Sequence, residues 1–142
     1  MKILSLLFMT LGLSLSSFLV HAEGLPVSTS PEGASIYIIS PKDGDTVCEE
    51  FTINFGLRGM GVAPAGVEKE NTGHHHLLID VETLPTTGQP MGKDVKHFGG
   101  GQTEATITLP KGKHTLQLIL GNHLHIPHEP VVVSEKITVI VE

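Results

Sequence analysis

The chain has 142 residues, which is within the usual size of a single domain, and a formal net charge of −6. Aromatic residues make up only 4% and tryptophan is absent, so a carbohydrate-binding or base-stacking surface is not expected. The acidic chain contains no run of basic residues, and nucleic acid and anionic membranes are therefore excluded as expected partners.

Residues 1–22 have the features of a secretory signal peptide. Lys2 gives a positive start, Ile3 to Val20 is an apolar run with Ser, Thr and Gly, and residues 20–22 match a small-residue cleavage pattern. We expect a periplasmic or secreted protein without stable membrane insertion after cleavage. An uncleaved anchor is the alternative, because the run is nearly long enough to span a bilayer. Residues 23–33, rich in Pro, Ser and Gly, are expected to form a short tether.

Alternating and β-rich segments follow in order along the rest of the chain. The first two, residues 34–39 and 46–55, are separated by the turn-forming residues 41–45. Irregular residues 57–73 lead to a strand that begins with three histidines, and residues 82–95 form a second irregular connection. Residues 103–109 and 113–120 flank Pro110-Lys-Gly112 and are expected to form a β-hairpin. Residues 131–141 form the last expected strand.

No segment after residue 22 shows a sustained apolar period of 3.6 residues. Six to seven strands in about a hundred residues predict an all-β fold, a single antiparallel immunoglobulin-like β-sandwich over residues 34–142. A closed barrel is the alternative. Because Cys48 is the only cysteine, no intrachain disulfide stabilises this domain, and we expect its thiol to be buried beside Val47 and Phe51.

Clustered histidines are the strongest functional signal in the sequence. Side chains alternate along a strand, so His74 and His76 share one face while His75 shares the other face with Leu77. A second cluster lies in residues 123–128. Imidazole suits copper and zinc, and the sequence therefore predicts one such ion. The candidate ligands are His74, His76, His97, His123, His125 and His128. Hydrogen bonding of these imidazoles to loop backbone is the alternative.

Two further histidines are interpreted as structural: His75, next to apolar neighbours, and His114, at the start of a strand. Because ordinary histidine titrates near pH 6.5, we expect protons to displace most of the metal by pH 5.

Several motifs resemble an uncharacterised family of small exported bacterial domains of unknown function. They are Gly59-Met-Gly-Val-Ala-Pro-Ala-Gly66, Asn71-Thr-Gly-His-His-His-Leu-Leu-Ile-Asp80, His97-Phe-Gly-Gly-Gly-Gln-Thr-Glu104, His114-Thr-Leu-Gln-Leu118 and His125-Ile-Pro-His128. The resemblance covers about residues 35–142 and implies no activity. A weaker likeness, to copper/zinc superoxide dismutase, rests on a strand with a His-x-His pair and distant histidines. The chain departs from that enzyme by lacking the disulfide pair and by having its only arginine, Arg58, in a Gly-rich region.

We expect a binding domain for a metal ion rather than an enzyme. One alternative is a metal-dependent enzyme such as a dismutase. Another is a structural or interaction domain of the cell envelope, for which the sequence names no protein partner.

Overall fold

Strands account for all the regular structure in residues 24–142, which are the residues that the computed structural model describes. The predicted signal peptide lies outside them. The strands are β1 (Ser35–Ser40), β2 (Thr46–Val47), β3 (Glu50–Arg58), β4 (Gly61–Val62), β5 (Thr72–Ile79), β6 (Lys96–His97), β7 (Glu104–Thr108), β8 (Gly112–Gly121) and β9 (Ile137–Val141). Among these described residues no helix is long and apolar enough to cross a membrane.

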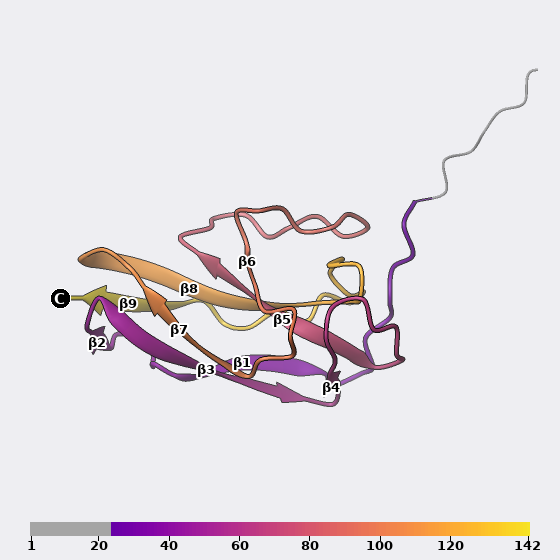
Figure 1. Cartoon of the computed structure of the whole chain (residues 1–142), viewed down its shortest axis with the longest axis horizontal. Helices are drawn as coiled ribbons and strands as arrows, with labels where there is room; N and C mark the ends of the chain where they lie inside the picture. Colours follow the sequence, from indigo (N-terminus) through magenta and orange to yellow (C-terminus); the bar gives the residue numbers. More distant parts are fainter. Residues whose placement is uncertain (1–23) are drawn as a thin grey trace, which may run out of the picture.

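Two sheets pack face to face (Figure 1). The smaller sheet has the order β1-β3-β7, and the larger has the order β2-β9-β8-β5-β4 with β6 paired to β5. The predicted all-β sandwich is confirmed, and six of the strands have five or more residues. The sandwich is not purely antiparallel, because β2 runs parallel to β9 and β4 runs parallel to β5 over two residues each.

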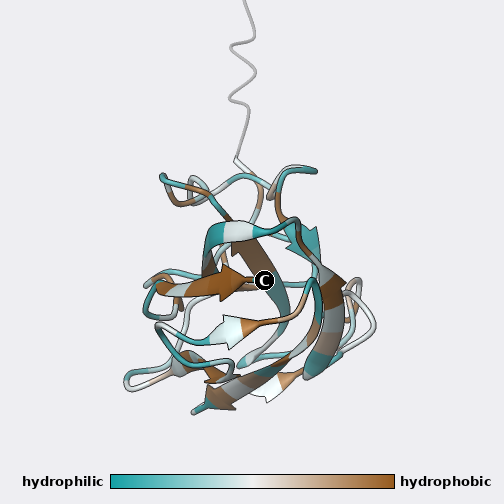
Figure 2. Ribbon diagram, turned by 90° about the vertical axis from the view of Figure 1, so that its left-hand side faces the viewer, coloured by the Kyte–Doolittle hydropathy of each residue, from teal (hydrophilic) through white to brown (hydrophobic). Residues whose placement is uncertain are grey.

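The main core lies between the two sheets. Ile53 and Phe55 of β3 face Leu77 of β5 and Leu116 and Leu118 of β8 in one apolar cluster. The strand ribbons in Figure 2 change between brown and teal along their length, as alternation of apolar and polar residues requires. Burial of this apolar surface is the main favourable term that holds the sheets together.

A second apolar cluster covers the opposite face of the larger sheet. It consists of Leu78, Val95 and Ile119, with Met91 and other partly buried residues packed against it. The connection between β5 and β6 lies over this face, on the side away from β3 (Figure 1). The larger sheet is therefore apolar on both faces, and its outer face carries side chains that the irregular residues 82–95 cover.

The hairpin expected from residues 103–120 is wrong. β7 pairs with β3 in the smaller sheet, whereas β8 pairs with β5 and β9 in the larger one. The chain crosses between sheets at Pro110 to Gly112, and Gly112 has a φ of 138°, which side chains rarely allow. Alternation does not distinguish the two arrangements, because Ile107 and Leu116 both point into the same core.

Two other segments differ from their expected surroundings. Cys48 is exposed, so the expected burial of its thiol is wrong; it lies between β2 and β3, outside either strand. In the segment expected to be a tether, the Ser30 main-chain N–H donates to Glu129 O at 3.1 Å and Ser30 Oγ donates to Pro130 O at 2.7 Å. These bonds tie the start of the described chain to the loop that follows β8.

Candidate metal centre

Strand pairing brings three histidines onto the outer face of the larger sheet. β5 places His74 and His76 on that face, with ring centroids 4.6 Å apart. β6 pairs with β5 so that His97 lies directly opposite His76, and their ring centroids are 5.1 Å apart. Residues directly opposite in an antiparallel pair point to the same side of the sheet. The three rings therefore lie together because of backbone register.

The fourth histidine, His125, comes from the loop after β8. The buried Asn122 organises this loop, since its Oδ1 accepts the main-chain N–H groups of Leu124 at 2.9 Å and of Ile126 at 3.0 Å. The main-chain N–H of His125 donates to Asn122 O at 2.9 Å, and His125 has a φ of 64°. A positive φ is uncommon for any residue but glycine, and it is more frequent in turns held by local side-chain bonds.

The four rings form a compact cluster. Each of His74, His76, His97 and His125 offers one nitrogen such that all four nitrogens lie within 4.8 Å of one another. His74 Nε2 and His125 Nδ1 are 2.9 Å apart, and the His97 and His125 centroids are 4.5 Å apart. Four nitrogens in tetrahedral coordination at about 2.0–2.1 Å from zinc lie about 3.3–3.4 Å from one another. Reaching that spacing from the observed one would require the rings to move closer together.

Burial leaves ring nitrogens of this cluster without hydrogen bonds. His74 and His76 are 0% and 2% exposed, and within residues 24–142 neither His74 Nδ1 nor His76 Nδ1 has a hydrogen-bond partner. A buried polar atom without a partner costs about 1–3 kcal/mol. A hydrogen-bonded histidine network explains the contact between His74 and His125 but not these unpaired nitrogens.

The environment of His74, His76 and His125 favours the neutral imidazole. Burial, followed by repulsion from His125 and His97, lowers the pKa of His74 to about 4. Burial, followed by repulsion from His74 and His97, lowers the pKa of His76 to about 3, and burial with repulsion from His97 lowers the pKa of His125. Neutral imidazole is the form that binds metal. The sequence-based expectation that protons displace most of the metal by pH 5 assumed that the ligands are protonated there. That assumption is wrong for His74 and His76, whose pKa values lie below that pH.

The other two candidate ligands lie away from the cluster. His123 and His128 line a different cavity, of about 440 Å³, together with residues 67–72. His128 is buried, and its Nδ1 and Nε2 face Leu120 O at 3.4 Å and Thr72 O at 3.2 Å. Of the three histidines in residues 123–128, His125 is thus the one that joins the four-histidine cluster.

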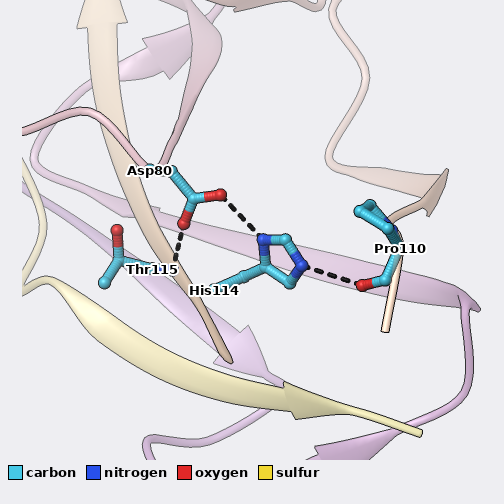
Figure 3. A network of polar contacts seen from close by, with 4 residues as sticks. All are labelled: Asp80, Pro110, His114 and Thr115. Atoms are coloured by element: carbon cyan, nitrogen blue, oxygen red, sulfur yellow. Dashed lines mark hydrogen bonds and ion pairs between the residues drawn. The ribbon is translucent and has the colours of Figure 1, made fainter. Parts of the chain in front are cut away.

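The histidines interpreted as structural lie outside the cluster. His75 is buried on the inner face of β5, where it packs against Phe55 at a centroid distance of 5.0 Å and its Nδ1 donates to Gln102 O at 3.1 Å. His114 Nδ1 donates to Asp80 Oδ2 at 2.7 Å, and its Nε2 lies 2.8 Å from Pro110 O (Figure 3). The hydrogen bond to Asp80 raises the pKa of His114. This contact joins the end of β5 to β8.

Three residues outside the predicted ligand set matter to the cluster: Gly121, Asn122 and Met91. A Cβ on Gly121 would lie 2.6 Å from His76 Cε1, so only glycine leaves room for that ring. Asn122 shapes the loop of His125, and Met91 donates its main-chain N–H to His125 O at 2.9 Å. Glycine at the end of a strand followed by asparagine is a signal of close approach and a side-chain-stabilised turn, which marks the first two positions. Met91 carries no comparable backbone signal, and its thioether can bind Cu(I) but more often serves packing.

Comparison with known proteins agrees with the resemblance drawn from the motifs. The family described as domain of unknown function DUF4399 matches residues 53–142, from β3 through β9. No curated protein and no solved structure matches the chain. The likeness to copper/zinc superoxide dismutase stays a prediction. Since the matched region is more than half of the sequence, the chain belongs to the family of the domain of unknown function DUF4399.

Proposed function

We propose that this domain is an exported binding module that holds one copper or zinc ion through His74, His76, His97 and His125. The observation that carries the proposal is the convergence of four ring nitrogens within 4.8 Å from three separate segments of the chain. Imidazole is a common ligand of both metals, and a site made only of histidines needs no cysteine. Export is inferred from the signal-peptide pattern in residues 1–22.

Supporting energetics come from burial. Within residues 24–142 the buried Nδ1 atoms of His74 and His76 lack hydrogen-bond partners, and an ion bound at such a nitrogen would satisfy it. Bound metal would stabilise the fold by mass action, contributing about 2.7 kcal/mol at a hundredfold excess over the dissociation constant. That contribution corresponds to a rise in melting temperature of several degrees, at roughly 2–8 °C per kcal/mol.

Titration calorimetry of purified, untagged protein with Cu(II) and with Zn(II) tests the proposal. We expect one ion per chain and a large loss of affinity in His97→Ala, a variant at an exposed ring whose removal leaves the core unchanged. The matched control is His123→Ala, which removes a half-buried imidazole outside the cluster. Stoichiometry near zero, or equal affinity in both variants and the unmodified protein, would sink the proposal.

A second function, metal-dependent catalysis, is favoured by one observation. A cavity of about 380 Å³ is lined by His76, His97 and His125, and it opens onto the same rings that would hold the ion. A metal with a coordination position open to such a cavity binds and activates small molecules. Turnover of superoxide or of an activated ester by metal-loaded protein, lost in His97→Ala, would support this function. Metal binding without turnover would support the binding function and count against the catalytic one.

A further inference from the structure

Met91 lies beside the four-histidine cluster. It belongs to the connection between β5 and β6, and its main-chain N–H donates to His125 O at 2.9 Å. Met91 lines the cavity of about 380 Å³ together with His76, His97 and His125. Met91 and three of the four candidate histidines therefore border one cavity.

The side chain of Met91 approaches His76 above Gly121. A single point, the ideal Cβ position of Gly121, lies 2.6 Å from His76 Cε1 and 2.7 Å from Met91 Cε. These two carbon atoms are therefore no farther apart than the sum of the two distances. Met91 Sδ is bonded directly to that Cε, and methionine is unbranched with three rotatable bonds, so its sulfur can reach an ion held by His76.

Packing is the competing role for this methionine. Met91 is half-buried and lies against the outer apolar cluster of Leu78, Val95 and Ile119. Met60 serves as the internal comparison, because it packs against the core between the sheets and does not line the histidine cavity. Packing does not require Met91 to border that cavity, whereas a ligand role does.

The charge of the cavity bears on which ion fits. The candidate ligands are imidazoles and a thioether, and among the described residues Lys93 is the one Lys, Arg, Asp or Glu that lines the cavity. Among residues 24–142 no carboxylate lines this cavity to balance the charge of a bound ion, and the charge left unbalanced is smaller for a monovalent ion than for a divalent one. Thioether sulfur is a soft ligand that favours Cu(I).

We propose that Met91 is a thioether ligand of this centre and makes it selective for Cu(I) over Zn(II). The inference rests on the proposed metal site at His74, His76, His97 and His125. It deepens that proposal by naming the metal, its oxidation state and a sulfur ligand beside the imidazoles.

The test compares Met91→Leu with Met60→Leu, both in a Cys48→Ser background so that the exposed thiol does not bind copper. Affinities are measured by competition with chromophoric chelators, under anaerobic conditions for Cu(I). We expect Met91→Leu to lose Cu(I) affinity roughly tenfold or more, as a direct ligand contributes at least as much as the outer-shell groups whose loss costs about 10–100-fold. Zn(II) affinity should stay unchanged, and Met60→Leu should change neither.

X-ray absorption at the copper edge identifies the atoms bound to copper directly, in protein that keeps Met91. Cu(I) bound to the Cys48→Ser protein should show a sulfur neighbour, and this neighbour should be missing in Met91→Leu. If Cu(I) and Zn(II) bind but copper has only nitrogen neighbours and Met91→Leu binds Cu(I) as before, the role of Met91 is overturned while the histidine site stands. If neither ion binds, the histidine site itself is overturned.

Discussion

Lowering the pH from 7.5 to 5 should destabilise the metal-free protein strongly. Burial lowers the pKa of His74 and His75 to about 4 and that of His76 to about 3, whereas histidine in the unfolded chain titrates near 6.5. Between these values the unfolded chain binds more protons than the folded one, so falling pH favours unfolding. The stability is fully present above about pH 7 and is lost as the pH falls from 6.5 towards 4.

The expected loss can be worked out for each ring. A pH of 5 lies about 1.5 units below the pKa of histidine in the unfolded chain. Protonation therefore lowers the free energy of the unfolded chain by about 2 kcal/mol per ring, and the buried ring does not gain this free energy. The three rings together reach about 6 kcal/mol, a large part of the roughly 5–15 kcal/mol that holds a typical domain folded. His114 acts in the opposite direction, because Asp80 raises its pKa.

Urea unfolding at pH 7.5 and at pH 5, with chelator present at both, measures this loss. The matched variant is His75→Leu, which removes one buried imidazole without touching the four-histidine cluster. Its hydrogen bond to Gln102 is lost at both pH values, so the difference between the two measurements isolates protonation. We expect that difference to be about 2 kcal/mol smaller than in the unmodified protein. Equal unfolding free energies of the unmodified protein at both pH values would refute the reasoning.

Three substitutions test other parts of the structure. Gly121→Ala places a Cβ 2.6 Å from His76 Cε1 and should lower the metal affinity measured by calorimetry roughly tenfold. An unchanged affinity would mean that the His76 ring is not a ligand. Asn122→Ala leaves buried N–H groups of the His125 loop unpaired; it should cost about 1–3 kcal/mol in urea unfolding and also weaken metal binding. Leu118→Ala empties a fully buried core position and should cost about 2–5 kcal/mol while the metal affinity of the folded protein stays unchanged.

The strands and the pairing of the histidines within β5 could be predicted because both depend on local alternation. A period of two assigned His74 and His76 to one face and His75 to the other, and the observed ring contacts agree with that assignment. The first two long strands, β1 and β3, also pair as an antiparallel unit.

The partners of these strands were harder to predict because they depend on contacts between distant residues. Local alternation has the same form whether β7 and β8 share a sheet or face each other across the core. The choice among His123, His125 and His128 likewise depends on one loop, in which Asn122 fixes the backbone and His128 turns towards main-chain carbonyls. Met91 joins the cavity through a long connection whose path its sequence does not specify.

The three consecutive histidines of β5 contribute to two different faces of the larger sheet. His75 packs between the sheets, while His74 and His76 point to the opposite face of the larger sheet. The backbone of that sheet separates these two rings from the main core. Selection can therefore act on the two sides separately. We expect related chains to be able to exchange or abandon the outer imidazoles while keeping the inner one, so that a common scaffold evolves different metal preferences without having to rebuild its interior.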